Sequence, residues 1–203
     1  RENITMATRG PIVVGRRKSA GQLDIYTRRA EGETVADMAK NGTWQFKALG
    51  NRGKKYQVMF GGRQFTLRNF GSSEWLFYAK EKKQRVLAKV KSTGDGFHLK
   101  HVKDWAHSDS PGMENSQWKK AADELVIQRG GRIWKKTFNV SKNGQRLATV
   151  NAPARSSSSP RSSGDLRIEY LTQGGSRQPA PLHPLLQVLV LVLVCSETLD
   201  RHL

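Results

Sequence analysis

The feature that most constrains this chain is an apolar run near its end, from Leu185 to Cys195, in which Gln187 is the one polar residue. The run has 11 residues, whereas a helix needs roughly 20 to cross a bilayer. It also lies far from the N-terminal position of a secretory signal. We therefore expect no transmembrane span, and we expect the run to be buried inside protein, where it helps to define the fold.

The conformation of the run is open at the level of sequence. Valine and leucine alternate in it, which favours a strand by propensity. A helix that is apolar all round fits equally well if protein surrounds it completely. A third possibility is an aberrant tail from altered splicing or a shifted reading frame. In each case the polar residues Ser196, Glu197 and Asp200 would mark the exit of the run into solvent.

Apolar and polar residues alternate over most of the chain between residues 22 and 150. Apolar pairs two residues apart, such as Phe65/Leu67 and Phe97/Leu99, are separated and flanked by polar residues. This period of two is typical of antiparallel strands with one packed and one solvated face. Turn dipeptides recur at hairpin spacing at Asn41-Gly42, Gly61-Gly62, Asp95-Gly96, Gly130-Gly131 and Asn143-Gly144. The pattern predicts a mainly β fold, a closed antiparallel barrel or a sandwich.

Two segments do not follow the strand pattern. Residues 1–21, which contain Arg16-Arg17-Lys18, are expected to form a flexible basic lead before a single domain over residues 22–203. Residues 152–164 contain the serine run Ser156 to Ser159 and are expected to form a disordered loop. The alternation then resumes from Leu166 to Tyr170, which predicts a last strand.

The positive charge of the chain belongs to its central part. The net charge is +18, and residues 40–103 hold 15 Lys and Arg against three Asp and Glu. Residues 151–203 are nearly balanced, with five basic against four acidic residues. Unless it is only a solvated face, a folded surface of this kind favours anionic partners: phosphoinositide headgroups, acidic membrane or nucleic acid.

Catalytic and metal-binding patterns are not found. His98, His101, Asp104 and His107 recur at every third residue, which invites a metal site. On a strand, however, His98 and His101 would project from opposite faces and could not share an ion. Phosphate-loop and dinucleotide motifs are missing from the sequence. We expect no catalytic residues, no cofactor and no metal, and we do not expect an enzyme.

The cysteine count bears on the compartment. Cys195 is the one cysteine of the chain, so no disulfide can form within it. Such usage favours a reducing environment. We expect an intracellular monomer that is cytoplasmic, peripherally associated with membranes, or nuclear.

Two segments resemble the tubby C-terminal-like superfamily, which includes tubby proteins, LURP-one-related proteins and phospholipid scramblases. The segment from Pro184 to Leu199 (PLLQVLVLVLVCSETL) is similar to the hydrophobic helix that threads the barrel of these proteins. The segment from Trp75 to Val102 resembles a tubby segment in which a basic loop leads to a strand that ends in Lys-x-Lys/Arg. The resemblance implies a tubby-like closed antiparallel β-barrel with a plug helix at about 184–199.

The resemblance also implies a ligand site. In tubby proteins a Lys-x-Arg pair grips the phosphates of phosphatidylinositol bisphosphate, and its counterpart here is Lys89-Val90-Lys91. Lysine in the second position keeps a point charge but loses the bidentate fork of arginine. Residues two apart on a strand project from the same face, so both ammonium groups can converge on one phosphate cluster. The preceding loop adds Lys80, Lys82, Lys83 and Arg85 to the predicted site, and Arg63 and Arg68 are candidates by proximity in sequence.

Together these observations predict a non-enzymatic binding module whose basic barrel face recognises phosphoinositides or another anionic membrane surface. The alternative is a barrel that binds RNA or single-stranded DNA and stacks bases on exposed aromatic side chains. The aromatic candidates for that platform are Trp75, Phe77, Tyr78, Trp134 and Phe138. A scramblase-like or scaffolding role is a third possibility. Lipid translocation ranks below binding, because a helix that fills a barrel cannot also span lipid.

Overall fold

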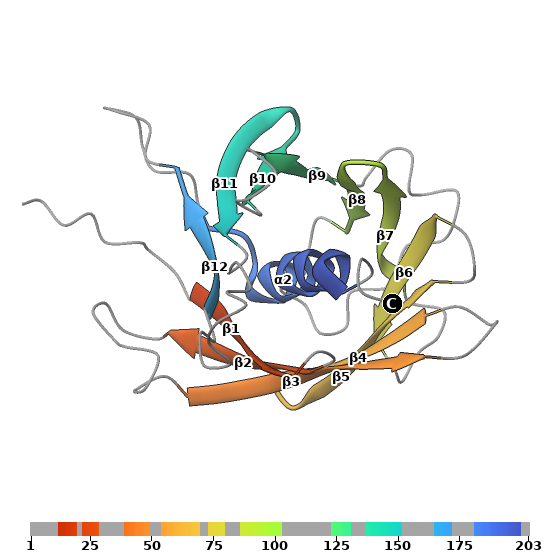
Figure 1. Cartoon of the computed structure of the whole chain (residues 1–203), viewed down its shortest axis with the longest axis vertical. Helices are drawn as coiled ribbons and strands as arrows, with labels where there is room; N and C mark the ends of the chain where they lie inside the picture. The colour runs from red at the N-terminus through yellow and green to blue at the C-terminus, as the bar shows by residue number, and fades with distance from the viewer. Residues whose placement is uncertain are drawn as a thin grey trace, which may run out of the picture.

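The computed structural model describes residues 12–19, 22–28, 39–48, 54–69, 73–79, 86–102, 123–130, 137–151, 165–171 and 181–199. Twelve antiparallel strands form a closed barrel in which each strand pairs with its neighbours in sequence, and β12 pairs with β1 to close the ring (Figure 1). Closure leaves the described sheet without an unpaired edge, where further strands could add. The predicted closed antiparallel barrel is confirmed.

The strands are short and similar in length. Their bounds are β1 Ile12–Ser19, β2 Gln22–Arg28, β3 Ala39–Ala48, β4 Lys54–Phe60, β5 Arg63–Asn69, β6 Glu74–Ala79, β7 Val86–Thr93, β8 Gly96–His101, β9 Asp123–Gly130, β10 Thr137–Lys142, β11 Gln145–Asn151 and β12 Asp165–Tyr170. The one helix described is α2, Pro184–Leu199.

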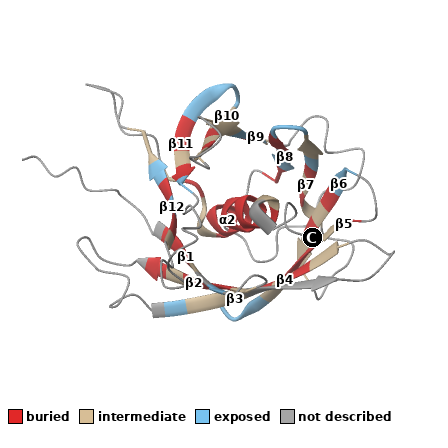
Figure 2. Cartoon of the chain, in the orientation of Figure 1, coloured by how far each residue is buried: buried red, intermediate tan, exposed pale blue. Residues whose placement is uncertain are grey.

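Alternation along the strands separates a buried inner face from a polar outer face. On β5, Phe65 and Leu67 are buried among core residues, and on β8 Phe97 and Leu99 are buried in the same way. On β8, His98 between them and Lys100 after them are exposed. The apolar positions predicted from the period of two therefore line the interior (Figure 2).

The apolar run near the end of the chain is helix α2, and it fills the barrel (Figures 1 and 2). Residues 188–194 are at most 1% exposed, so the helix is buried on all sides rather than along one stripe. A helix satisfies its backbone hydrogen bonds internally, so it can be enclosed by apolar side chains without leaving peptide groups unpaired. The strand alternative is thereby wrong, and the predicted plug helix is confirmed.

Gln187, the one polar residue of the run, ties the helix to the wall. It is fully buried, and its side-chain carbonyl accepts a hydrogen bond of 3.1 Å from the backbone N–H of Val13 on β1. Its amide donates to the carbonyl of Leu182 at 2.7 Å. A buried polar group is costly unless it is paired. These bonds therefore favour one depth and rotation of α2 within the barrel.

The two ends of α2 are also held by polar contacts. Before the helix, the backbone N–H of Leu182 donates to the hydroxyl of Tyr170 at 3.0 Å, and burial raises the pKa of Tyr170 to about 12. Near its end, Glu197 forms an ion pair with Arg129 of β9. Ser196 is buried, so the expectation that Ser196 and Glu197 mark an exit into solvent is wrong for Ser196. Asp200 lies outside the described residues.

The expected flexible lead over residues 1–21 is wrong for residues 12–19, which form β1. Val13 and Val14 are buried, and β1 hydrogen-bonds to both β2 and β12. The basic triplet Arg16-Arg17-Lys18 concealed this strand in the sequence, because three consecutive charged residues interrupt the alternation of apolar and polar residues. Residues 1–11 and the expected loop at 152–164 lie outside the described residues.

Some of the predicted turn dipeptides form turns in the structure and others do not. Gly61-Gly62 and Asn143-Gly144 have positive φ angles of 58°, 73°, 50° and 82°, as tight hairpin turns require. The turn predicted at Asp95-Gly96 is shifted by one residue, since Gly96 already begins β8. Asn41-Gly42 lies inside β3, where a Cβ on Gly42 would come 1.9 Å from the carbonyl oxygen of Met59. Glycine is needed there for close strand approach rather than for a turn. Gly130 ends β9, and Gly131 lies outside the described residues.

Candidate functional site

The two lysines of the predicted phosphate site lie on the outward face of β7. Lys91 is exposed and Lys89 is half-buried. Val90, between the two lysines, and Ala88, before them, belong to the core. Two residues span about 6.6 Å along a strand, so both side chains can reach one anionic group. The predicted common face of Lys89 and Lys91 is confirmed.

The other predicted cations fall into two groups. Four of them, Lys80, Lys82, Lys83 and Arg85, lie in the connection from β6 to β7, outside the described residues. Arg63 and Arg68 lie at opposite ends of β5, about 16 Å apart along the strand. Arg63 is exposed near the β4–β5 turn, with its guanidinium carbon 5.8 Å from the centre of the Phe65 ring. It is therefore remote from the β7 lysines in register.

Strand pairing places further cations beside the β7 lysines. Lys89 lies directly opposite Lys100 of β8 and, on its other side, opposite Leu76 of β6. Leu76 is in turn opposite Arg68 of β5, which is opposite Lys55 of β4. We call Lys55, Arg68, Lys89 and Lys100 the cationic row. The row crosses the outer face from β4 to β8. Leu76 of β6 lies within it, between Arg68 and Lys89, and is apolar.

Two acidic residues lie at the margins of the cationic row. Glu74 is opposite Lys91, and Glu124 is opposite Lys100. Glu124 lies closer to His98, with 3.8 Å between its Oε1 and the Nδ1 of His98. Within the described ranges, Lys55, Lys91 and Lys100 form no ion pair. Because like charges directly opposite one another repel, the pairing of Lys89 with Lys100 concentrates positive potential over β7 and β8.

The hairpin that carries Lys91 and Lys100 is held by side-chain hydrogen bonds at its turn. Asp95 accepts one from the Thr93 hydroxyl at 3.0 Å and one from the Gln128 amide of β9 at 2.7 Å. These two bonds, that from Gln128 first, lower the pKa of Asp95 below its usual range. The turn between β7 and β8 is thus joined to β9 by a side-chain hydrogen bond.

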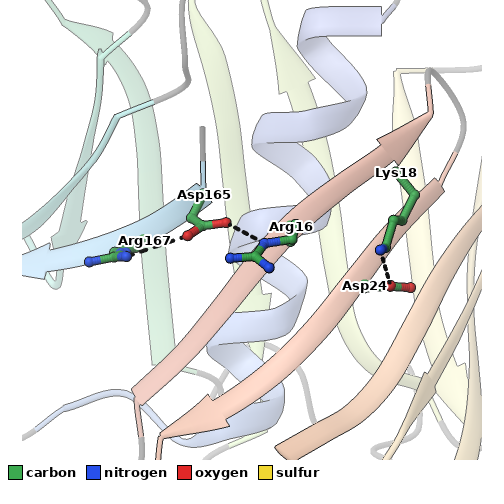
Figure 3. A network of polar contacts seen from close by, with 5 residues as sticks. All are labelled: Arg16, Lys18, Asp24, Asp165 and Arg167. Atoms are coloured by element: carbon green, nitrogen blue, oxygen red, sulfur yellow. Dashed lines mark hydrogen bonds and ion pairs between the residues drawn. The ribbon is translucent and has the colours of Figure 1, made fainter. Parts of the chain in front are cut away.

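A second group of charged side chains lies on the outer face of β12, β1, β2 and β3, and Figure 3 shows those of its members that belong to β12, β1 and β2. It comprises Arg16, Lys18, Asp24, Lys40, Asp165 and Arg167, which we call the paired cluster. Here strand register places opposite charges next to one another, since Arg16 of β1 faces Asp165 of β12 on one side and Asp24 of β2 on the other.

Each carboxylate of the paired cluster lies between two cations. Arg16 donates to Asp165 at 3.0 Å, and this hydrogen bond raises the pKa of Arg16 above its ordinary value. Arg167 lies 3.4 Å from the other carboxylate oxygen of Asp165. Asp24 is only 2% exposed and lies 3.0 Å from the Nζ of Lys40 and 3.6 Å from that of Lys18. Every cation of the cluster therefore lies beside a carboxylate, although four cations share two carboxylates.

Three of the five aromatic residues named for a nucleic-acid platform are not on the surface. Trp75, Phe77 and Phe138 are buried in the core, where they cannot stack on bases, so the expectation is wrong for these three. Tyr78 is half-buried and lies at an outward position of β6, and Trp134 lies outside the described residues. Sequence alternation had already favoured the core for most of them.

The structure describes some of the residues considered for a metal site or a reactive thiol. His98 is exposed on the outer face, whereas His101 is buried on the inner face, so the predicted separation of the two rings is confirmed. Burial lowers the pKa of His101. Asp104 and His107 lie outside the described residues. The part of the chain that is described contains no group of three or more His, Cys, Asp or Glu side chains able to hold a metal ion. Cys195 is buried within α2.

Among the described residues, no helix has both the length and the apolar character needed to cross a bilayer. In comparisons with known proteins, no protein-family model, curated protein or solved structure matches the chain. The tubby-like resemblance therefore stays a prediction, carried by the two segments described above.

Proposed function

We propose that this protein is a non-enzymatic module that docks its outer barrel face on phosphoinositide-bearing or other anionic membrane. The observation that carries the proposal is the projection of Lys89 and Lys91 from one outward face of β7, beside Lys100 of β8. In the paired cluster on the other side of the ring, every cation lies beside a carboxylate, which leaves this face as the better site for an anionic surface.

The strength of such docking follows from the number of lysines that reach the membrane. Each Lys or Arg near an anionic surface contributes about 1 kcal/mol. Three cations on the β7–β8 face would therefore supply about 3 kcal/mol, which suits reversible attachment, and cations of the β6–β7 connection would add to it. Salt screens this attraction, so binding should weaken as ionic strength rises.

The test is sedimentation with vesicles of phosphatidylcholine that contain phosphatidylinositol bisphosphate. The variant Lys89→Ala/Lys91→Ala should bind about 20- to 30-fold more weakly than the parent, from about 1 kcal/mol per lysine. A matched control is Arg146→Ala/Arg167→Ala, which removes the same charge from exposed positions of β11 and β12. Equal loss in both variants would indicate a response to net charge alone, and unchanged binding of the lysine variant would contradict the site.

Nucleic acid is the alternative partner, because a chain of net charge +18 with a row of cations also attracts polyphosphate chains. The burial of Trp75, Phe77 and Phe138 weighs against it, since base stacking needs exposed rings. A gel shift with single-stranded RNA, run beside the vesicle assay at the same salt concentration, separates the two. Tight RNA binding without vesicle binding would replace the membrane proposal.

A further inference from the structure

We propose that the membrane-contacting surface extends across the cationic row, with Arg68 and Lys100 at the headgroups and Leu76 entering the lipid interface between them. This inference rests on the proposed membrane function, and it adds the residues that would make contact and the way they would do so. It comes from the register of four strands, in which Arg68, Leu76, Lys89 and Lys100 lie directly opposite one another in turn.

The row is small enough to meet a membrane as one face. Neighbouring strands lie about 4.8 Å apart, so the three intervals from β5 to β8 span about 14 Å. In a ring of 12 strands this is a quarter of the circumference. Long Arg and Lys side chains can bend across that curvature, because their alkyl stems are flexible. Lys55, one strand further round on β4, would reach the surface only at its margin.

The arrangement of charges on the cationic row favours binding to an anionic surface. Lys89 and Lys100 are directly opposite, and cross-strand pairs of like charge destabilise a sheet. Lys100 forms no ion pair with a described residue, although Glu124 is its neighbour across the β8–β9 pair. Lys100 is exposed, so a layer of anionic headgroups over β8 would bring an opposite charge to it. The paired cluster gains nothing comparable, because its carboxylates already lie beside its cations.

Leu76 points to a bilayer rather than a soluble polyanion. It occupies an outward position of β6, is only half-buried, and is not part of the core cluster that includes Trp75 and Phe77. An apolar side chain gains little from a phosphate chain but gains free energy when it leaves water for hydrocarbon. Tyr78 lies two residues along the same face, and tyrosine is enriched at membrane interfaces.

The first experiment measures binding of single variants to vesicles of phosphatidylcholine with phosphatidylinositol bisphosphate. Leu76→Ser and Lys100→Ala should each weaken binding about fivefold, from lost apolar burial and one lost cation respectively. The matched controls are Met59→Ser, at the exposed apolar position of β4, and Arg146→Ala, and these should bind like the parent. Thermal melts of all variants identify any that lose the fold.

The second experiment detects insertion independently of affinity. In Leu76→Trp, a Trp at the centre of the row should be quenched by brominated lipid chains when vesicles are in excess. The parent, whose Trp75 is buried, supplies the baseline. Quenching no greater than the parent's, with the variant fully bound, would overturn the insertion of position 76.

Competition with soluble inositol phosphates and with single-stranded RNA distinguishes the sources of phosphate. Leu76→Ser should leave binding of both soluble ligands unchanged while it weakens vesicle binding, and an equal loss for all three would overturn the lipid contact. If Lys89→Ala/Lys91→Ala abolishes vesicle binding but Leu76→Ser and Lys100→Ala do not weaken it, this inference fails while the proposed function survives. If the parent binds no vesicles, both fail.

Discussion

The paired cluster and the cationic row are built from the same kinds of side chain on the same kind of surface, yet register gives them opposite properties. Arg16 faces Asp165 and Asp24 across two strand pairs, so attraction stabilises the wall formed by β12, β1 and β2. Lys89 faces Lys100, so like charges lie opposite one another on the wall that contains β7 and β8. Surface charge therefore says little by itself, and the identity of the cross-strand neighbour decides whether a cation supports the sheet or is available to a partner.

The two walls also differ in how they contact the plug helix α2. On the side of the paired cluster, β1 accepts the plug directly, since the N–H of Val13 donates to Gln187 of α2. Tyr170 of β12 accepts a hydrogen bond from the segment that leads into α2. This wall contacts the plug on its inner face and places its cations beside carboxylates on its outer face. The wall with the cationic row packs apolar residues against the same core but places lysine opposite lysine on its outer face.

The largest effect is expected where the wall of the paired cluster meets the plug. Gln187→Ala removes two buried hydrogen bonds and leaves the N–H of Val13 and the carbonyl of Leu182 without their partner. The free energy of unfolding should fall by about 4 kcal/mol, counting roughly 2 kcal/mol for each orphaned group. Urea denaturation measures it. Gln187→Met, which keeps the volume, should still lose most of that amount, and full stability of the methionine variant would contradict a role for the bonds.

A smaller effect is expected in the paired cluster itself. Asp24→Ala leaves Lys18 and Lys40 facing one another without their carboxylate, although both remain half-exposed and can be solvated. We expect a loss of about 1 to 2 kcal/mol in the free energy of unfolding. The loss should shrink in high salt, since screening weakens both attraction and repulsion. A variant as stable as the parent would show that the cluster does not support its wall.

The cationic row should respond with the opposite sign. Lys100→Gln removes the repulsion with Lys89 and should raise the free energy of unfolding by about 0.3 kcal/mol, at the low end for a cross-strand pair. Chemical denaturation at low salt gives the change, and Arg146→Gln on β11 serves as the control for removal of one positive charge. A clear loss of stability in Lys100→Gln would show that this lysine stabilises its wall, as the paired cluster does, and would contradict the proposed difference between the two walls.

The smallest effect is a pH dependence from the inner face of β8. Burial lowers the pKa of His101 below its ordinary value of 6.5, so the unfolded chain binds a proton at a higher pH than the folded one. The free energy of unfolding should therefore be constant above about 6.5 with respect to this group and fall as the pH drops below that value. Replacement by Gln should flatten the acid limb of the curve. An acid limb of equal slope in His101→Gln would assign it to other groups.

The outline of the fold could be predicted because its signals are local. Period-two alternation at Phe65/Leu67 and Phe97/Leu99 marked strands, and a run too short for a bilayer but apolar throughout marked a buried element. The expectations failed where one local signal had two causes. Glycine at position 42 serves a close backbone approach rather than a turn, and the charges of Arg16-Arg17-Lys18 concealed β1.

The candidate site could be predicted only within one strand. Lys89 and Lys91 are two residues apart, and a strand fixes their common face from sequence alone. Lys100, Leu76 and Arg68 carried no such signal, because a residue's neighbour across a strand pair depends on the register of two segments joined by a turn or loop.

The sequence by itself determined that this protein is a basic, mainly β chain with an apolar segment that must be enclosed, since periodicity, length and composition act over a few residues. The tertiary structure alone decided that the segment is a helix pinned by Gln187 to Val13, and that Arg16 meets carboxylates while Lys89 meets another lysine. Those outcomes depend on closure of the ring, which brings β1 to β12 and fixes the strand registers around the plug.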